Sequence, residues 1–175
     1  MNSKIQRVAL SDASEEMIPI TYLTGDATNP ESTGPRIIAH VCNDIGGWGK
    51  GFVLAISKRW PEPESKYREW FSEREANDFG LGAVQFVAVD EGLWVANMIG
   101  QHKIKRGDDG TPPIRYDAIE KCLHQIAKFA IDHQATIHMP RIGCGLAGGN
   151  WSEIEPLVNQ ACSEANVPVF VYDFK

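Results

Sequence analysis

The apolar residues of the chain fall into short runs separated by glycine, proline and charged residues. Six of these runs are nearly continuous, which is typical of strands in a sheet covered on both faces. They predict strands at Ile20–Thr24, Arg36–Cys42, Gly82–Val89, Leu93–Ile99, Thr136–Ile142 and Pro168–Phe174. The turn Asp90-Glu91-Gly92 predicts that the third and fourth strands pair as an antiparallel hairpin.

Other segments carry apolar residues at helical spacing. The clearest is Tyr116–His133, where Ile119 and Leu123 share one face. Further helices are predicted at Gly51–Arg59 and Glu64–Phe71. A last helix is predicted to open at Ser152, because Ser152 and Glu155 have the spacing of a capping box. Pro156, one residue further on, leaves room for this boundary to shift by a turn.

Helices that alternate with strands, with one hairpin in the middle, predict an α/β fold: a three-layer α/β/α sandwich with a mixed central sheet. The length fits a single domain over residues 1–175, with 1–19 as an irregular lead-in or an edge strand at Gln6–Leu10. Residues Lys103–Pro113 are charged and then rich in glycine and proline, which indicates a mobile loop.

The segment from His40 to Phe52 is the first candidate for chemistry. A buried strand leads into a loop with four glycines in the six residues 46–51, and the loop leads into an apolar helix. Glycine lets the backbone approach a ligand closely, and the first helical turn offers unpaired N–H groups at the positive end of its dipole. The loop lacks the Gly-Lys-Ser/Thr ending of a P-loop, and a tight turn without a ligand is the alternative interpretation.

A second segment, from Met139 to Trp151, repeats the arrangement of strand, glycine loop and helix. Both loops follow strands, and open α/β sheets bind ligands at the carboxyl ends of their strands. The two loops therefore predict two walls of one cleft for a phosphate or diphosphate.

Three motifs in this order resemble the macro domain family, which binds ADP-ribose. They are Gly25-Asp26-Ala27-Thr28, His40-Val41-Cys42-Asn43 with its glycine loop, and Pro140-Arg141-Ile142-Gly143-Cys144-Gly145. The resemblance extends from about Ile20 to Phe174. The chain is similar above all to the branch of the family that holds the ADP-ribose-1''-phosphate phosphatases and the terminal ADP-ribose protein glycohydrolase.

The resemblance also assigns residues to the ligand. It implies that Asp26 accepts a hydrogen bond from the adenine amine, whereas the residue alone would favour a turn in which Asp26 bonds its own backbone. It places Asn43 against the distal ribose and matches His40 to a histidine of both relatives, although a strand histidine can also be a core residue. Candidates for catalysis are His40, Asn43 and Asp44, the last as a group that positions a water. The other candidate ligand residues are Ala27, Gly47, Trp48, Gly49, Gly51, Phe52, Gly143, Cys144, Gly145, Leu146, Ala147, Tyr172 and Phe174.

Two positions depart from the glycohydrolase. Where it carries a reactive lysine and an aspartate, this chain has Gln101 and Ala147, which can neither form a Schiff base nor act as a general acid. Lys103 or Lys105 could replace the lysine if the loop register differs. Ala147 also stands where many macro domains carry an aromatic residue over the distal ribose. Trp48 could fill that place or could equally cap the core. We therefore expect hydrolysis at the distal ribose by attack of water, with a non-catalytic reader of ADP-ribosylated proteins as the alternative.

Composition narrows the partners further. A net charge of −6 argues against nucleic acid as the main partner, since that role normally shows a basic face. The expected ligand is ADP-ribose or a derivative, with ADP-ribosylated proteins as further partners. The four cysteines are widely spaced, which argues against a zinc site or a disulfide framework and favours a reduced, cytoplasmic setting. We expect no cofactor, no metal and no membrane segment, because no apolar run is long enough to span a bilayer.

Overall fold

A computed structural model describes residues 17–174 of the chain. The protein is built around a six-stranded sheet in the order β1-β6-β5-β2-β4-β3. The strands are β1 (Thr21–Thr24), β2 (Arg36–Asn43), β3 (Val84–Asp90), β4 (Leu93–Gln101), β5 (Thr136–Met139) and β6 (Val169–Asp173). Neighbouring strands are parallel except β3 and β4, which form the predicted antiparallel hairpin. The predicted mixed sheet is therefore confirmed.

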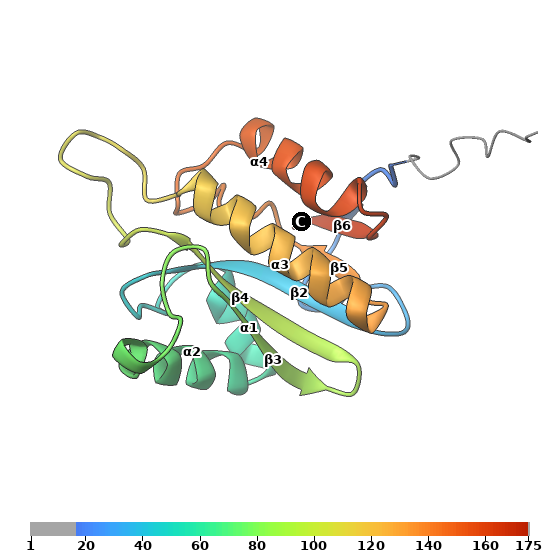
Figure 1. Cartoon of the computed structure of the whole chain (residues 1–175), viewed down its shortest axis with the longest axis horizontal. Helices are drawn as coiled ribbons and strands as arrows, with labels where there is room; N and C mark the ends of the chain where they lie inside the picture. Colours follow the sequence, from blue (N-terminus) through green and yellow to red (C-terminus); the bar gives the residue numbers. More distant parts are fainter. Residues whose placement is uncertain (1–16, 175) are drawn as a thin grey trace, which may run out of the picture.

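Helices cover both faces of the sheet. They are α1 (Phe52–Arg59), α2 (Glu62–Ser72), α3 (Tyr116–His133) and α4 (Trp151–Val158), with the short helical turns η1 (Arg74–Ala76) and η2 (Asn159–Ser163). α3 and α4 lie side by side over one face, while α1 and α2 pack on the other (Figure 1). This arrangement confirms the three-layer α/β/α sandwich.

The central strand β2 shows why the sequence folds in three layers. Successive side chains of a strand point to opposite faces. Ile37 and Ala39 enter the core beneath α3 and α4, whereas Ile38 and Cys42 enter the core beneath α1 and α2. Ile37 and Ile38 are fully buried, and burial of such a side chain contributes about 1.5–3 kcal/mol. A strand whose apolar side chains point to both faces of the sheet needs a helical layer on each side.

The structure differs from the prediction at the start of the last helix. The N-cap of α4 is Asn150, which makes no side-chain capping bond, so Ser152 and Glu155 do not form the predicted capping box. The Glu155 carboxylate instead accepts hydrogen bonds from the Tyr22 hydroxyl and from Trp151 Nε1. Glu155 therefore contacts Tyr22 of the distant strand β1 instead of capping its own helix.

A further difference concerns the end of β5. β5 ends at Met139 instead of the predicted Ile142, because Pro140 has no N–H to continue a strand ladder. The expected edge strand Gln6–Leu10 lies outside the described residues. Within residues 17–174, no helix is both long enough and apolar enough to cross a membrane.

Residues 102–113 form an extension between β4 and α3 that projects away from the sheet (Figure 1). Backbone hydrogen bonds cross it, from His102 N to Pro113 O at 2.8 Å and from Gly107 N to Thr111 O at 3.0 Å. The segment expected as a loop is thus a hydrogen-bonded, hairpin-like extension, called the 102–113 extension below.

Candidate functional site

A cavity of about 630 Å³ opens between the two glycine loops, at the carboxyl ends of β2 and β5. Its size lies within the roughly 300–1,000 Å³ of typical ligand pockets. Eight residues that the sequence analysis singled out line this cavity: His40, Gly49, Gly51, Phe52, Gly143, Gly145, Leu146 and Ala147. Eight other residues, which were not among the predicted site residues, complete the lining: Val41, Lys50, Val53, Gln101, Ile104, Pro140, Arg141 and Ile142. The structure thus brings the two glycine loops together as the walls of one cavity.

The first glycine loop is shaped by the side chain of Asn43 at the end of β2. Asn43 Oδ1 accepts hydrogen bonds from Gly47 N at 2.9 Å, from Ile45 N at 3.1 Å and from the Tyr67 hydroxyl at 2.9 Å. Asn43 Nδ2 donates to Gly47 O at 2.9 Å. The amide is therefore engaged by the loop itself, and the loop is preformed around Gly49.

The second glycine loop is held by its own backbone. Gly143 has a φ of +71°, and a Cβ there would stand 2.1 Å from Ile114 Cδ1, so only glycine fits without strain. Gly149 N donates to Gly143 O at 2.7 Å, and Gly148 N donates to Gly145 O at 3.0 Å. These bonds fold the loop so that Gly145 stands at the cavity.

Several backbone N–H groups beside the cavity are free to bind an anion, among them those of Gly49, Gly145 and Leu146. Within residues 17–174, the N–H groups of Gly49, Gly145 and Leu146 make no hydrogen bond to another residue. A Cβ at Gly49 or Gly145 would meet no atom within 4 Å, so both glycines border open space. Successive unpaired N–H groups in a concave loop are a favoured site for phosphate oxygens.

His40 lines the cavity from β2 and is otherwise buried. Its Nε2 lies 2.6 Å from Asn97 Oδ1. Asn97 Nδ2 donates to Pro63 O and Gln85 Oε1, so Asn97 Oδ1 acts as acceptor and His40 Nε2 carries the hydrogen. Burial lowers the pKa of His40 to about 4, against the opposing effect of the Asn97 bond. At neutral pH His40 is therefore an uncharged imidazole with a lone pair on Nδ1.

Asp44 does not line the cavity and is occupied by the 102–113 extension. Its carboxylate lies 2.6 Å from His102 Nδ1 and accepts a hydrogen bond from Lys103 N at 2.7 Å. Asp44 therefore ties the extension to the end of β2. No local pattern predicts the pair of Asp44 and His102, since its members are 58 residues apart in the chain.

Asp26 lies in a turn after β1, outside the lining of the cavity. Its Oδ1 accepts from Thr28 N at 2.8 Å and from Thr28 Oγ1 at 2.7 Å, while Arg59 Nη2 approaches Oδ2 at 3.3 Å. Partial burial acts to raise the pKa of Asp26, but the bonds from Thr28 and Arg59 outweigh it and hold the pKa below its ordinary value. Asp26 is therefore an ionised turn residue, and its Oδ2 has room for another donor.

Several candidate ligand residues lie away from the cavity lining. Trp48 is buried: its Nε1 donates to Ser57 Oγ at 2.8 Å and its ring contacts Tyr67, so it belongs to the core beneath α1 and α2. Tyr172 is also buried, and its hydroxyl lies 2.8 Å from His138 Nδ1. Phe174 follows β6 and is 83% exposed. The remaining candidates outside the lining are Ala27, Gly47 and Cys144.

Metal-binding side chains and thiols are two further kinds of group that could carry chemistry. Residues 17–174 hold no group of three or more His, Cys, Asp and Glu side chains placed to bind a metal ion. All four cysteines are free thiols, and burial raises the pKa of Cys122 and Cys162 to about 12. Those two thiols therefore remain protonated at neutral pH.

Curated proteins related to this chain carry informative names. An ADP-ribose 1''-phosphate phosphatase of Meyerozyma guilliermondii is 26% identical, over 82% of this chain and 94% of that protein. The chromodomain-helicase-DNA-binding protein 1-like of Danio rerio is 28% identical over 96% of this chain, which spans only 17% of its length. No family model matches the chain.

Solved structures match more closely. The macrodomain protein of Streptomyces coelicolor is 55% identical, with a TM-score of 0.80 over 89% of this chain and 99% of that chain. A protein of unknown function from Bacteroides thetaiotaomicron is 54% identical, with a TM-score of 0.87 over 89% of this chain and 98% of that one. The three motifs, the mixed sheet between two helical layers and these matches lead to one conclusion: the chain belongs to the macro domain family.

Proposed function

We propose that the protein binds ADP-ribose in the 630 Å³ cavity, with the diphosphate held by the two glycine loops. The observation that carries this proposal is the set of unpaired N–H groups of Gly49, Gly145 and Leu146 beside open space. Such groups bind phosphate oxygens without a basic side chain, which fits a chain with a net charge of −6. The name of the fungal relative, an ADP-ribose 1''-phosphate phosphatase, supports the same ligand.

The two ends of ADP-ribose are assigned to different sets of residues. We place adenine toward Asp26, whose Oδ2 has a single long contact with Arg59 Nη2 at 3.3 Å. We assign Ala27, Tyr172 and Phe174 to the same end of the ligand. We place the distal ribose toward β2 and β4, where His40 and Gln101 line the cavity. Asn43, Gly47 and Trp48 then act by shaping the first loop, and Cys144 by shaping the second.

The reaction that we propose is hydrolysis at the distal ribose. The substrate is ADP-ribose 1''-phosphate or ADP-ribose esterified to a protein carboxylate. Gln101 and Ala147 cannot supply a Schiff base or a general acid, so a water is the nucleophile. The neutral His40 can accept a hydrogen bond from that water, and Asp44 fixes the wall beside it.

Binding without turnover, as a reader of ADP-ribosylated proteins, is the second candidate, because no Asp or Glu is found among the described residues that line the cavity. The cytoplasmic location remains a prediction.

One pair of incubations separates the two candidates. The protein is mixed with ADP-ribose 1''-phosphate or with glutamate-ADP-ribosylated protein, and free ADP-ribose is followed with time. Release from either substrate, without a borohydride-trapped lysine adduct, establishes a hydrolase of the proposed kind. Calorimetric binding of ADP-ribose without release establishes a reader. Equal affinity for AMP and ADP-ribose would refute the two-loop diphosphate site.

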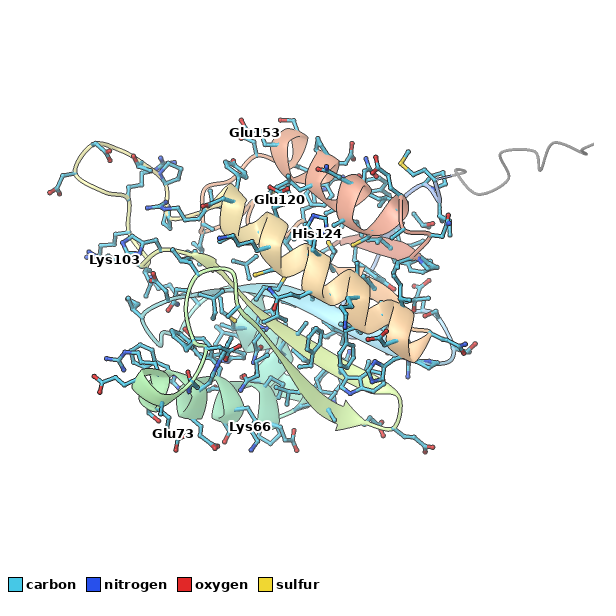
Figure 2. All side chains as sticks on the ribbon, viewed as in Figure 1. Lys66, Glu73, Lys103, Glu120, His124 and Glu153 are labelled. Atoms are coloured by element: carbon cyan, nitrogen blue, oxygen red, sulfur yellow. The ribbon has the colours of Figure 1, made fainter. Side chains whose placement is uncertain are left out.

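The role of His40 has its own test. His40→Gln keeps a side chain that can hydrogen-bond but cannot take up a proton. Turnover should fall by roughly 10²–10⁴-fold, the usual contribution of an acid–base group, while the affinity for ADP-ribose changes little. The matched control is His124→Gln, an exposed histidine on α3 (Figure 2). Full activity of His40→Gln would show that the reacting centre lies elsewhere.

A further inference from the structure

The strand β3 forms one edge of the sheet. It is the last strand in the order β1-β6-β5-β2-β4-β3, so β4 is its neighbour on one side only (Figure 1). Within residues 17–174, the backbone of residues 84–90 makes no hydrogen bond outside its ladder with β4. One row of N–H and C=O groups of β3 is therefore left without a partner strand.

The residues that face this edge follow from the register of the hairpin. Ile99 N donates to Ala83 O at 3.0 Å, so residue 83 bonds toward the β4 side. In an antiparallel pair, bonding to the partner strand recurs at every second residue. Residues 85 and 87 therefore also bond toward β4. The N–H and C=O groups of the alternate residues face the free edge: Val84, Phe86 and Ala88.

β3 lacks most of the features that keep sheet edges apart. Edge strands are usually protected by being short, by proline or by charged side chains. β3 has seven residues, carries no charge before Asp90 and contains no proline. The register shift between Ala88 and Asp90 disturbs only its end. The strand at the other end of the sheet, β1, has four residues. β3 is thus the edge that is suited to pair with another strand.

Partly buried aromatic rings stand beside this edge on the face covered by α3. The Phe86 ring stacks on Phe129 with their centroids 3.9 Å apart, and Phe129 stacks on His133 at the same distance. Phe86 is only partly buried, because no element covers the outer side of β3. Aromatic pairs across neighbouring strands stabilise a sheet. A second strand that placed an aromatic side chain opposite Phe86 would therefore complete this layer.

The charges at the two ends of β3 are opposite. Lys121 of α3 packs on Gly82, just before the strand, where its Cδ lies 3.1 Å from the position that a Cβ of Gly82 would occupy. Asp90 and Glu91 stand at the other end and are exposed. None of these three charged side chains forms an ion pair with another described residue. In an antiparallel pairing of two β3 strands, the acidic end of each strand meets Lys121 of the partner subunit.

We propose that two copies of the protein pair antiparallel through β3 and form a two-fold symmetric dimer with one continuous sheet. Pairing of all three edge-facing residues places the axis at Phe86, so Val84 of one subunit bonds to Ala88 of the partner subunit. A second copy fits this edge because the contacts are self-complementary, as a two-fold interface requires. None of residues 84–90 lines the cavity between the glycine loops, so the dimer leaves both cavities free and does not depend on the proposed function.

The first test measures the mass of the full chain in solution. Sedimentation velocity between roughly 1 and 100 µM, the range in which weak interfaces dissociate, should show a monomer–dimer equilibrium. Ala88→Pro removes an N–H that faces the free edge and none that bonds to β4, and edge strands tolerate such a proline. This variant should remain a monomer throughout while its urea midpoint stays close to that of the unsubstituted protein. An unsubstituted protein that is monomeric at every concentration would overturn the proposal.

The second test exchanges the charges. Asp90→Lys places like charges opposite each other at both ends of the interface and should weaken the dimer by roughly ten- to a hundredfold. Adding Lys121→Asp to the same chain reverses both partners and should restore the dimer. The matched control is Glu153→Lys, an exposed residue on α4 away from β3, which should leave the dissociation constant unchanged (Figure 2). Equal behaviour of Asp90→Lys and Glu153→Lys, or a failure of the double exchange to restore the dimer, would show that the dimer uses another surface.

Amide hydrogen exchange identifies what pairs with the edge. The N–H groups of Val84, Phe86 and Ala88 should be protected in the dimer and should lose that protection when the protein is diluted to the monomer. Protection that persists in the monomer would mean that another part of the same chain covers β3. A dimer in which these three N–H groups exchange freely would associate elsewhere. Either result would overturn the proposal.

Discussion

The two glycine loops look alike in the sequence but are built differently. The first is held by a side chain, since Asn43 bonds to Ile45, Gly47 and Tyr67 around it. The second is held by backbone bonds and by the close fit of Ile114 against Gly143. Loops with similar glycine spacing therefore contain two kinds of glycine. Some are needed for a backbone conformation or a close contact, and others leave space for a ligand.

Gly143→Ala tests the close fit in the second loop. The added Cβ would stand 2.1 Å from Ile114 Cδ1 at a residue with a φ of +71°. Strain at positive φ and overpacking should together lower the free energy of unfolding by about 2–5 kcal/mol. The matched variant Gly145→Ala borders open space, and its urea unfolding curve should shift by less than about 0.5 kcal/mol. Equal losses in both variants would contradict the distinction between the two glycines.

Asn43→Ala tests the side-chain support of the first loop. It leaves the buried Tyr67 hydroxyl with one acceptor instead of two and removes the acceptor of two loop N–H groups. The free energy of unfolding should fall by about 1–3 kcal/mol, the cost of unsatisfied buried polar groups. Asn43→Asp, which keeps the acceptor oxygens, should lose less. If Asn43 served only the reaction, stability would stay unchanged while turnover fell.

A smaller effect should come from the strands that precede the loops. Burial lowers the pKa of His40 in β2 to about 4, and burial together with the Arg36 charge does the same for His138 in β5. Both pKa values lie below the unfolded value of about 6.5, so the stabilisation is full above pH 6.5 and declines as the pH falls toward 4.

Urea unfolding at pH 7 and pH 5 measures this decline. Each histidine should account for about 1–2 kcal/mol between the two pH values. His138→Gln should reduce the pH dependence, whereas the exposed His124→Gln should leave it as it was. An identical dependence in both variants would show that His138 is not held neutral by the fold.

Much of the fold follows from local pattern. The helix Tyr116–His133 was predicted with its observed bounds, because one long apolar face and a clear end are local properties. The hairpin of β3 and β4 and the mixed sheet were also confirmed. The capping box at the start of α4 was predicted wrongly, since Glu155 is taken by Tyr22 of β1, a partner that no local pattern reveals.

The site was predictable only in part, for the same reason. Glycine spacing pointed to both walls of the cavity, and eight candidates line it. The partners of the polar residues were not predictable: Asn43 is occupied by Tyr67, Asp44 by His102, and Trp48 by Ser57. Each contact depends on how distant segments pack, so a residue type that suits a ligand also suits a structural bond.

The most direct test of the account measures ADP-ribose affinity by calorimetry in three glycine variants. Gly49→Val and Gly145→Val place a side chain in the open space beside the unpaired N–H groups, whereas Gly80→Val fills equally open space away from the cavity. The account predicts that the first two lose more than about a hundredfold in affinity, or about 2.7 kcal/mol, while Gly80→Val binds like the unsubstituted protein. Unchanged affinity in Gly49→Val and Gly145→Val, with all three variants folded, would contradict a diphosphate site between the two loops.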